Sequence, residues 1–249
     1  MVINDDCFNV MKDIKSKSVD LILVDPPYGI SRKSMFSQTN DHTPEDMALK
    51  YGGMSLDFGD WDKEEIDLDM LFAEYRRVLR PGGTLVFFFD IWKSSQVKSS
   101  AEANGFKQPR VCQWHKTNPV PVNSKRNYLS NAIEFFFTFV KGKLPTFNSE
   151  YDNGVYRYPL CHGKERLNHP TQKPLALISD IVEKHSSPGD MVLDTFAGTF
   201  TVHNACDNLN RECISIERDS LYFDIGRDRV NENRILLNKK RHIPFLLYT

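Results

Sequence analysis

The chain has 249 residues, of which 40% are hydrophobic and 26% are charged, and its formal net charge is −1 at pH 7. These values suit one folded domain and exclude a strongly basic or strongly acidic protein. No stretch approaches the ~18 apolar residues of a membrane span, and the first residues lack the pattern of a signal peptide. The five cysteines include no Cys-x-x-Cys pair. We therefore expect reduced thiols in a cytoplasmic protein, with no metal site and no membrane contact.

The charges are unevenly distributed along the chain. Residues 41–69 carry ten acidic and two basic side chains, whereas residues 107–173 carry eleven basic and four acidic ones. The middle third is therefore basic by a net charge of +7. This pattern favours a polyanionic partner, although a solvated basic surface explains the charge equally well.

The apolar run Val19–Val24 predicts a buried parallel strand, which ends at Asp25-Pro26-Pro27-Tyr28. The prolines cannot donate to a sheet ladder, so the strand stops and a stiff loop follows. In an open α/β sheet, ligands bind at the carboxyl ends of the strands. A carboxylate, an aromatic ring and carbonyls without local partners can hold a flat ligand such as a base. The alternative is an ordinary proline-rich turn.

The remaining elements alternate between helices and strands. Helical spacing of apolar residues predicts helices over about 64–79, 92–104 and 175–185, one ending near Asn210, and one over about 220–237. Apolar or β-like runs predict strands at 84–89, 110–115, 132–140, 191–194 and 213–216. The segments 30–61 and 141–168 are irregular. We predict an α/β fold, a doubly wound and mostly parallel sheet, in a single domain of residues 1–249.

Two acids end successive strands of a predicted βαβ unit. Asp194 precedes the small-residue loop 195–199, and Glu217 ends the next strand 23 positions later. An acid in the second position accepts hydrogen bonds from ribose hydroxyls, and a glycine in the loop lets a ligand approach closely. Because Gly-x-Gly-x-x-Gly is absent, a nucleoside cofactor without a pyrophosphate fits better than a dinucleotide. An ordinary βαβ turn is the alternative.

These motifs together resemble the β class of DNA amino-methyltransferases, in which the Asp-Pro-Pro-Tyr motif precedes the S-adenosylmethionine motif. Residues 19–30 look like the catalytic strand and loop, and residues 193–199 look like the cofactor loop. Three further stretches resemble family motifs: Asp6-Cys7, the segment 114–121 (Trp-His-Lys-Thr-Asn-Pro-Val-Pro) and the segment 169–174 (His-Pro-Thr-Gln-Lys-Pro). The resemblance implies a Rossmann-like methyltransferase fold with permuted motif order.

The resemblance also implies the roles of individual residues. The catalytic residues are Asp25, Pro26, Pro27 and Tyr28. The S-adenosylmethionine contacts are Asp6, Cys7, Asp25, Lys173, Asp194, Phe196, Ala197, Gly198, Thr199 and Glu217. The charge pattern and the irregular segments, rather than the resemblance, suggest the DNA contacts: the segments 31–60 and 141–168 and Lys116, Asn118, Lys125, Arg126, Lys141, Lys143, Arg157, Lys164 and Arg166. For the basic, tyrosine-rich segment 141–168, a surface loop with packing tyrosines is the alternative.

The implied activity is site-specific methylation of the N6 amino group of adenine in double-stranded DNA, after the base has left the helix. Cytosine N4 is the alternative target, since both bases present an amino group beside a ring nitrogen. A protein or free-nucleotide methyltransferase is disfavoured by the motif order. A homodimer and a cognate restriction nuclease are open as partners.

Phe200 departs from the family pattern, which usually has a second glycine at this position. A bulky ring at a point of close approach could narrow the cofactor pocket or change its loop, which puts cofactor affinity in doubt. A non-catalytic DNA-binding paralogue is therefore the rival hypothesis from a different functional class.

Overall fold

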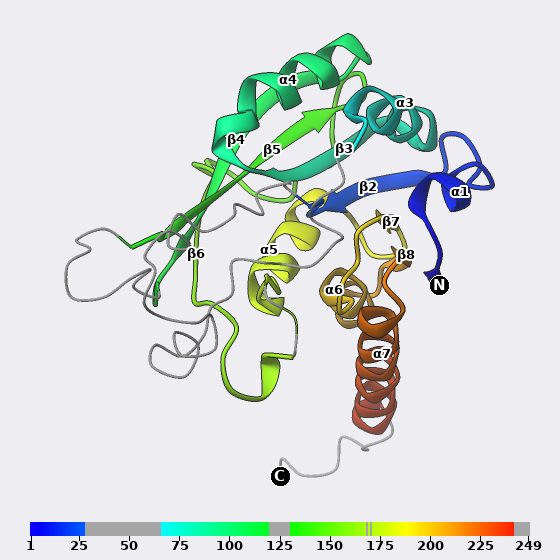
Figure 1. The fold of residues 1–249 in the computed structure, drawn as a ribbon, viewed down its shortest axis with the longest axis vertical. Helices are drawn as coiled ribbons and strands as arrows, with labels where there is room; N and C mark the ends of the chain where they lie inside the picture. Colours follow the sequence, from blue (N-terminus) through cyan, green and yellow to red (C-terminus); the bar gives the residue numbers. More distant parts are fainter. Residues whose placement is uncertain (28–65, 120–129, 168, 170, 242–249) are drawn as a thin grey trace, which may run out of the picture. The chain divides into compact units, whose positions relative to one another are not determined.

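The computed structural model describes residues 1–27, 66–119, 130–167, 169 and 171–241. The strands in this part of the chain form one sheet in the order β1-β8-β7-β2-β3-β5-β4-β6 (Figure 1). Their bounds are β1 Val2–Asn4, β2 Val19–Val24, β3 Leu79–Phe89, β4 Lys107–Lys116, β5 Ile133–Val140, β6 Val155–Tyr158, β7 Met191–Asp194 and β8 Glu212–Glu217.

One strand of this sheet runs against the others. β5 is antiparallel to both of its neighbours, β3 and β4, whereas the other pairings between described strands are parallel. The carboxyl ends of the parallel strands therefore share an edge with the start of β5. The predicted doubly wound, mostly parallel α/β fold is confirmed.

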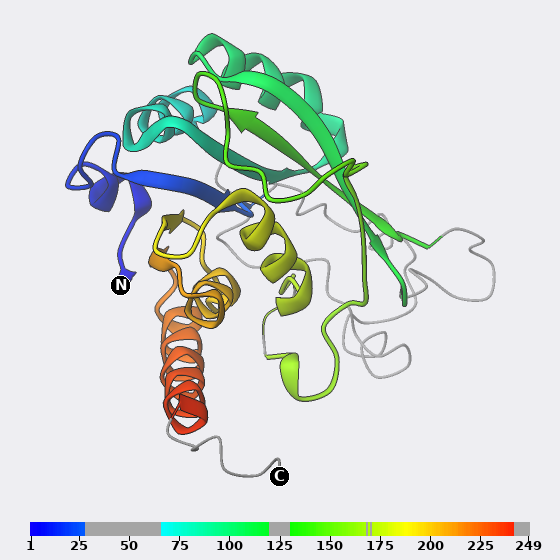
Figure 2. The ribbon, with the colours of Figure 1, turned by 180° about the vertical axis from the view of Figure 1, so that it is seen from behind.

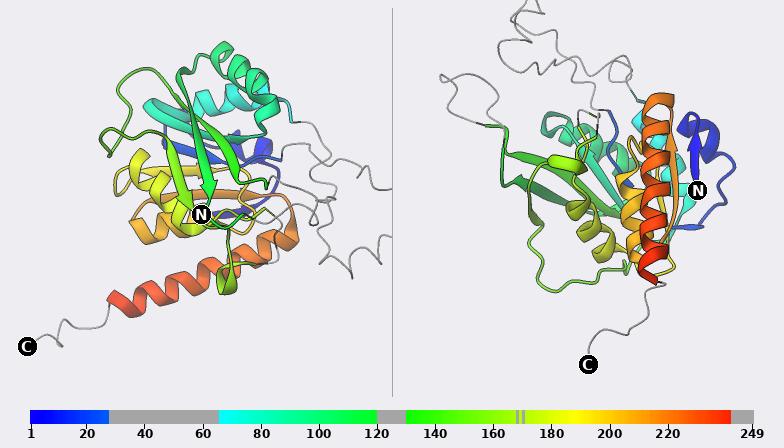
Figure 3. Two further views of the ribbon diagram at one scale, coloured as in Figure 1. Left: turned by 90° about the vertical axis from the view of Figure 1, so that its left-hand side faces the viewer. Right: turned by 90° about the horizontal axis from the view of Figure 1, so that it is seen from below.

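Helices cover both faces of the sheet, as Figure 2 shows from behind. One face carries α3, which contacts β3, with α1 and α4 packed against α3. The other face carries three helices, of which α5 contacts β2, α6 contacts β7 and β8, and α7 contacts β1 and β8. The second half of α7 projects away from the sheet (Figure 3). The helix bounds are α1 Cys7–Met11, α3 Leu68–Val78, α4 Ser94–Ala103, α5 Leu175–His185, α6 Thr201–Leu209 and α7 Ser220–Arg241. None of the described helices is long and apolar enough to cross a membrane.

Two local predictions differ from the structure. The break expected between the predicted helix over about 64–79 and the predicted strand at 84–89 lies inside β3, which begins at Leu79 and has a register irregularity against β2. Gly82 allows this path because its φ of +81° lies in the left-handed region. β6 falls in the segment expected to be irregular, because its four residues Val155–Tyr158 gain a strand conformation by pairing with β4. A strand this short carries little periodic signal.

Aromatic side chains build much of the core on both faces of β3 and β5, and α3 covers one of these faces. Phe88 and Phe136 face each other across the two strands with ring centroids 4.9 Å apart, and Phe72 of α3 packs 5.1 Å from Phe87. Each of these rings is almost completely buried, and burial of such a ring stabilises the fold by roughly 1.5–3 kcal/mol. This core holds β2 and its carboxyl-terminal loop in place.

Contacts group Met1–Pro26 with Leu68–Thr249 in one compact unit, separate from Pro27–Asp67. The elements described here belong to the first unit. The prediction of a single domain over residues 1–249 stays a prediction.

Candidate active site

Four acidic side chains follow the ends of four neighbouring parallel strands. Asp25 follows β2, Asp194 ends β7, Glu217 ends β8, and Asp6 lies two residues after β1. The sheet order β1-β8-β7-β2 places these strand ends in a row along one edge. Sequence reasoning assigned Asp25 to catalysis and to the cofactor, and the other three acids to the cofactor alone. The topology brings all four to the same edge.

The loop after β7 is held by hydrogen bonds from its backbone to the acids on either side. The amide of Phe196 donates to Asp194 at 3.1 Å, and the amide of Gly198 donates to Glu217 Oε2 at 2.7 Å. The other oxygen of Glu217 accepts from the amide of Asp219 at 2.8 Å. The buried hydroxyls of Tyr75 and Thr195 lie 2.5 Å apart, which links this loop to α3.

The pKa values of Asp194 and Glu217 are both raised, which favours the neutral form of each acid. Burial raises the pKa of Asp194 well above its ordinary value, with nearby Cys213 and Glu217 adding to the effect. Burial also raises the pKa of Glu217, against the lowering by its two backbone hydrogen bonds. Acids with raised pKa values at the ends of strands occur often at ligand-binding sites.

Gly198 is required where the cofactor loop meets the segment 169–174. Its φ is +49°, and a Cβ atom there would lie 3.0 Å from Nε2 of His169. The His169 ring also packs 4.4 Å from the ring of Tyr222. Burial lowers the pKa of His169 to about 4, and the charge of Lys173 lowers it further, so the ring is neutral near pH 7. The segments 193–199 and 169–174, which are separated in sequence, therefore lie against each other at Gly198 and His169.

Phe200 does not line an open pocket, so the expectation that its ring narrows the cofactor site is wrong. Its side chain has no exposed surface and packs in a cluster with Ala197, Val230 and Phe223. Its ring meets that of Phe223 edge to face at 5.7 Å. The backbone carries the special conformation instead, with φ 59° and ψ 41° at the start of α6. The ring is a packing element between α6 and α7.

The two predicted cofactor residues near the N-terminus, Asp6 and Cys7, differ in their surroundings: Asp6 caps α1, and Cys7 lies in the core. One carboxylate oxygen of Asp6 accepts a hydrogen bond from the amide of Phe8 at 2.8 Å and caps α1. Cys7 is buried, and burial together with the charge of Asp6 raises the pKa of its thiol to about 12. Cys7 is therefore a neutral thiol in the core, whereas Asp6 is half-buried beside the edge of the sheet.

Lys173 was predicted as a cofactor contact, and the structure pairs it with the catalytic candidate. Its ammonium forms an ion pair with Asp25 and lies 3.1 Å from Oε2 of Glu134. Burial alone would lower the pKa of Lys173, but the two carboxylates outweigh burial and raise it. Sequence reasoning missed Glu134, which lies at the start of an apolar strand without a motif of its own.

The predicted DNA contacts fall into groups that lie at different places. Lys116 is buried, with its ammonium 2.8 Å from Oε1 of Glu134, so it belongs to the site interior and not to a DNA-facing surface. Asn118 accepts a hydrogen bond from the amide of Leu160 at 2.6 Å. Three of the predicted basic side chains are exposed, one in β6 and two after it: Arg157, Lys164 and Arg166. Because β6 is parallel to β4, its carboxyl end lies at the sheet edge of Asp25.

Two of the predicted DNA contacts lie at the opposite edge. β5 runs antiparallel, so Lys141 and Lys143, which follow its end, are carried away from Asp25. Lys143 is exposed there. Lys141 is buried, and its ammonium donates to the carbonyls of Arg76 and Leu79 at the end of α3. This ammonium is not available to a phosphate, so the predicted DNA contact of Lys141 is corrected to a structural role.

Replacing Lys141 with methionine tests that correction. The change removes two charge-assisted hydrogen bonds at the end of α3 and leaves two carbonyls without this partner. We expect the free energy of unfolding to fall by about 1–3 kcal/mol, measured by urea denaturation, with DNA affinity unchanged. Lys143→Met is the matched control, since its exposed side chain should affect neither quantity. Weakened DNA binding at unchanged stability would contradict the structural role.

Several predicted residues lie outside the described part of the chain. These are Tyr28, Lys125, Arg126 and the segment 31–60. Their assigned roles stay predictions. The other catalytic candidates, Pro26 and Pro27, follow Asp25 directly and are buried and half-buried, respectively.

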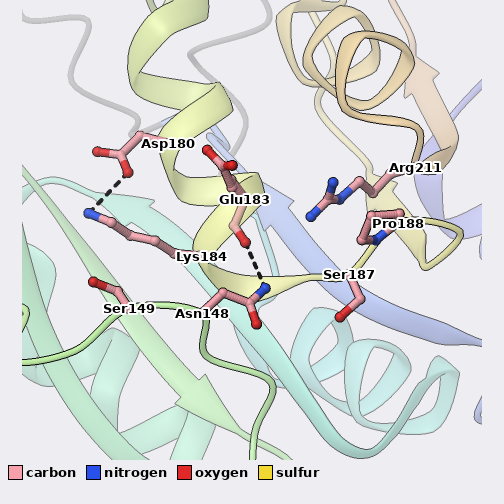
Figure 4. A pocket seen from close by; sticks show the side chains of 8 residues that line it. All are labelled: Asn148, Ser149, Asp180, Glu183, Lys184, Ser187, Pro188 and Arg211. Atoms are coloured by element: carbon pink, nitrogen blue, oxygen red, sulfur yellow. Dashed lines mark hydrogen bonds and ion pairs between the residues drawn. The ribbon is translucent and has the colours of Figure 1, made fainter.

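A separate concavity of about 470 Å³ lies at the far end of α5. Figure 4 shows its charged and polar lining, with Asn148 bonded to the carbonyl of Glu183 and Lys184 paired with Asp180. Arg211 donates to the carbonyl of Ser186 at 2.7 Å. These contacts join the segment after β5 to α5 and the loop before β7. The concavity is thus at the edge opposite Asp25 and is not the site described above.

Comparisons with known proteins agree with this arrangement. The DNA methylase family N6_N4_Mtase matches residues 19–228. The chain is 28% identical over 255 residues to the type II methyltransferase M.HinfI of Haemophilus influenzae, covering 93% of this chain and 68% of that protein. It is also 28% identical to the type II methyltransferase M2.LlaDCHI of Lactococcus lactis subsp. cremoris, covering 93% and 89% of the two chains.

Solved structures give the same result. The crystal structure of the M1.HpyAVI–SAM complex superposes with a TM-score of 0.69 at 31% identity, covering 93% of this chain and 98% of that one. The cytosine-N4-specific PvuII DNA methyltransferase has a TM-score of 0.70 at 15% identity, covering 96% and 91%, and shares the fold. The family match spans most of the chain, including the Asp25 loop and the Asp194–Glu217 unit. The chain belongs to the N6/N4 DNA methylase family.

Proposed function

We propose that this protein transfers a methyl group from S-adenosylmethionine to the N6 amino group of adenine in double-stranded DNA. One observation carries the proposal: Asp25, at the end of β2, lies at the same sheet edge as Asp194 and Glu217, at the ends of the next two strands. A nucleoside cofactor on the Asp194–Glu217 unit would place its reactive end beside a base held at Asp25.

The residues at this edge fit S-adenosylmethionine. Glu217 offers carboxylate oxygens to ribose hydroxyls, and Gly198 keeps the loop close to the sheet. Phe196 is half-buried in the same loop, and Asp6 is half-buried beside β1, where an adenine ring and its amino group have partners. M1.HpyAVI, which is 31% identical to this chain, has been crystallised with this cofactor. When bound, S-adenosylmethionine supplies the electrophilic methyl group.

The chain's own part in the reaction is positioning and electrostatics. An exocyclic amino nitrogen is a poor nucleophile because its lone pair is delocalised into the ring. Asp25 accepts a hydrogen bond from this amino group, and the carbonyl of Pro26 accepts a second one. The two bonds favour a pyramidal nitrogen whose lone pair points toward the methyl group. Tyr28 stacks on the base, which has left the helix at a cost of a few kcal/mol.

The choice of adenine follows from the aspartate that heads the Asp25-Pro26-Pro27-Tyr28 motif, which is more typical of adenine enzymes in this family. Cytosine N4 is the second candidate, because its amino group also lies beside a ring nitrogen. Neither chemistry uses a cysteine nucleophile, in agreement with the burial of all five thiols. We also propose cytoplasmic action, a homodimer and a cognate restriction nuclease; the two relatives in the sequence comparison are type II methyltransferases.

Expression in a host that lacks DNA methyltransferases tests the target base directly. Mass spectrometry of the digested host DNA should detect N6-methyladenine, at a level that depends on the site frequency. N4-methylcytosine in its place would establish the second candidate. If purified protein binds DNA but no methylated base appears in host DNA, and calorimetry detects no binding of S-adenosylmethionine, then the protein is a non-catalytic DNA-binding paralogue.

A further inference from the structure

Four side chains of alternating charge form a connected row that begins at Asp25. Lys173 pairs with Asp25 and lies 3.1 Å from Oε2 of Glu134, while Lys116 lies 2.8 Å from Oε1 of the same glutamate. They come from the loop after β2, the segment before α5, the start of β5 and the end of β4. The row has two positive and two negative charges, so its net charge is zero.

The two lysines of this row are shielded from water. The side chains of Lys173 and Lys116 are only 7% and 8% exposed, against 25% for Glu134 and Asp25. The Lys173 ammonium also lies 5.0 Å from the centre of the Phe88 ring. An unpaired charge in such surroundings is strongly destabilising, so each lysine depends on the carboxylate beside it.

The direction of β5 explains why Glu134 reaches this place. Because β5 is antiparallel to β3, it begins at the edge where β2 and β3 end. Glu134 is paired in register with Trp114 of β4, and Lys116 lies two residues further on the same face. Glu134 thus faces one lysine with each oxygen: Oε1 lies 2.8 Å from Lys116, and Oε2 lies 3.1 Å from Lys173, an ion pair without hydrogen-bond geometry.

We propose that Glu134 is a positioning residue for methyl transfer, which holds Lys173 in the orientation that orders the Asp25 carboxylate. This inference rests on the proposed function of Asp25. Glu134 itself does not touch the base. It fixes the far side of the Lys173 ammonium, so that the near side meets Asp25 in one geometry.

The charge state of Glu134 agrees with this role. Burial alone would raise the pKa of Glu134, but Lys173 and Lys116 outweigh burial and lower it. The carboxylate is therefore ionised at neutral pH. Without it, the two ammonium groups would repel each other and Lys173 would shift relative to Asp25.

The variant Glu134→Gln keeps the shape of the side chain and removes its charge. We expect the single-turnover rate of methyl transfer to fall by about tenfold to a hundredfold, as displaced catalytic groups generally cause. Affinities for S-adenosylmethionine and DNA should stay within about threefold of the wild-type values. Glu134→Asp, which keeps the charge, should recover part of the rate. Glu102→Gln breaks the exposed pair with Lys98 on α4 and is the matched control with an unchanged rate.

A double variant separates this role from simple charge balance. If Glu134 served only to neutralise Lys116, then Glu134→Gln combined with Lys116→Met would remove both charges and restore the rate of the Lys116→Met enzyme. We expect Glu134→Gln to slow the Lys116→Met enzyme by about the same factor as it slows the wild type. Recovery of the Lys116→Met rate in the double variant would overturn the proposal. So would a Glu134→Gln enzyme whose rate falls only as much as its ligand binding or its folded fraction falls.

A chemical readout tests the Glu134–Lys173 contact without methyl transfer. Trace acetylation, mapped by peptide mass spectrometry, reports how often Lys173 carries a free amine when its labelling is divided by that of Lys141, a lysine of similar burial that does not contact Glu134. Loss of the Glu134 charge should lower the pKa of Lys173, and its labelling should rise by about tenfold because the free amine becomes more abundant. If the labelling of Lys173 is the same in Glu134→Gln as in the wild type, Glu134 does not hold the Lys173 ammonium, and the proposal is overturned. A wild-type protein that transfers no methyl group overturns the proposed function, and with it the catalytic part of this inference.

Discussion

Replacing Asp25 with alanine should reduce methyl transfer by at least about 100- to 1,000-fold, the usual loss when one stabilising hydrogen bond to a reacting group is removed. Asp25 stands at the end of β2 and is paired with Lys173, beside the Asp194–Glu217 unit. In the proposed mechanism its carboxylate accepts the hydrogen bond that frees the nitrogen lone pair. DNA should still bind, because the exposed basic side chains after β6 are unchanged.

The Asp25 experiment needs a measurement of binding beside that of activity. Single-turnover assays give the rate, and a gel-shift titration at fixed salt gives the DNA affinity. Asp25→Asn keeps the shape of the side chain and should also be strongly impaired, since the amide cannot replace the charge opposite Lys173. Asp69→Asn, on the exposed start of α3, is the control for loss of a carboxylate elsewhere. Full activity of Asp25→Ala would rule out the role assigned to this group.

Replacing Phe200 with alanine should lower the free energy of unfolding by about 3–5 kcal/mol, as expected for a buried phenylalanine that leaves a cavity. The ring has no exposed surface and packs against Phe223, Val230 and Gly226. Chemical denaturation of the purified variant measures the loss. Folded protein should retain its affinity for S-adenosylmethionine, because the ring lines no open pocket.

Two further variants separate the ring from its backbone. Phe200→Gly also removes the side chain but accepts the left-handed φ of 59°, so it should be about 1 kcal/mol more stable than Phe200→Ala. Gly226→Ala would place a Cβ atom 2.8 Å from the Phe200 ring. It should destabilise the wild type and cost less in the Phe200→Ala background, where the ring is absent and the close contact with the Thr199 backbone carbon, at 3.1 Å, remains. If Phe200→Ala were as stable as wild type and bound the cofactor more tightly, the ring would have to line the pocket.

The sequence alone determined the main features of the site because they are local. An apolar run that ends in an acid predicts a buried strand with a carboxylate at its carboxyl end, and this pattern located Asp25, Asp194 and Glu217. Alternation of strands and helices predicts a parallel sheet, in which such ends share one edge. The order of the motifs then indicated the family without reference to any contact between them.

The tertiary structure decided which charged groups belong to the site, because pairing depends on contacts between residues far apart in sequence. The direction of β5 carries Lys141 to the opposite edge and brings Glu134 to Asp25. Lys116 looked like a surface cation in the sequence but is buried in an ion pair. The ring of Phe200 likewise packs toward α7, against Phe223 and Val230, where it has no exposed surface. Residue type and spacing do not specify these contacts, since strand direction and side-chain burial are set by the packing of the whole sheet.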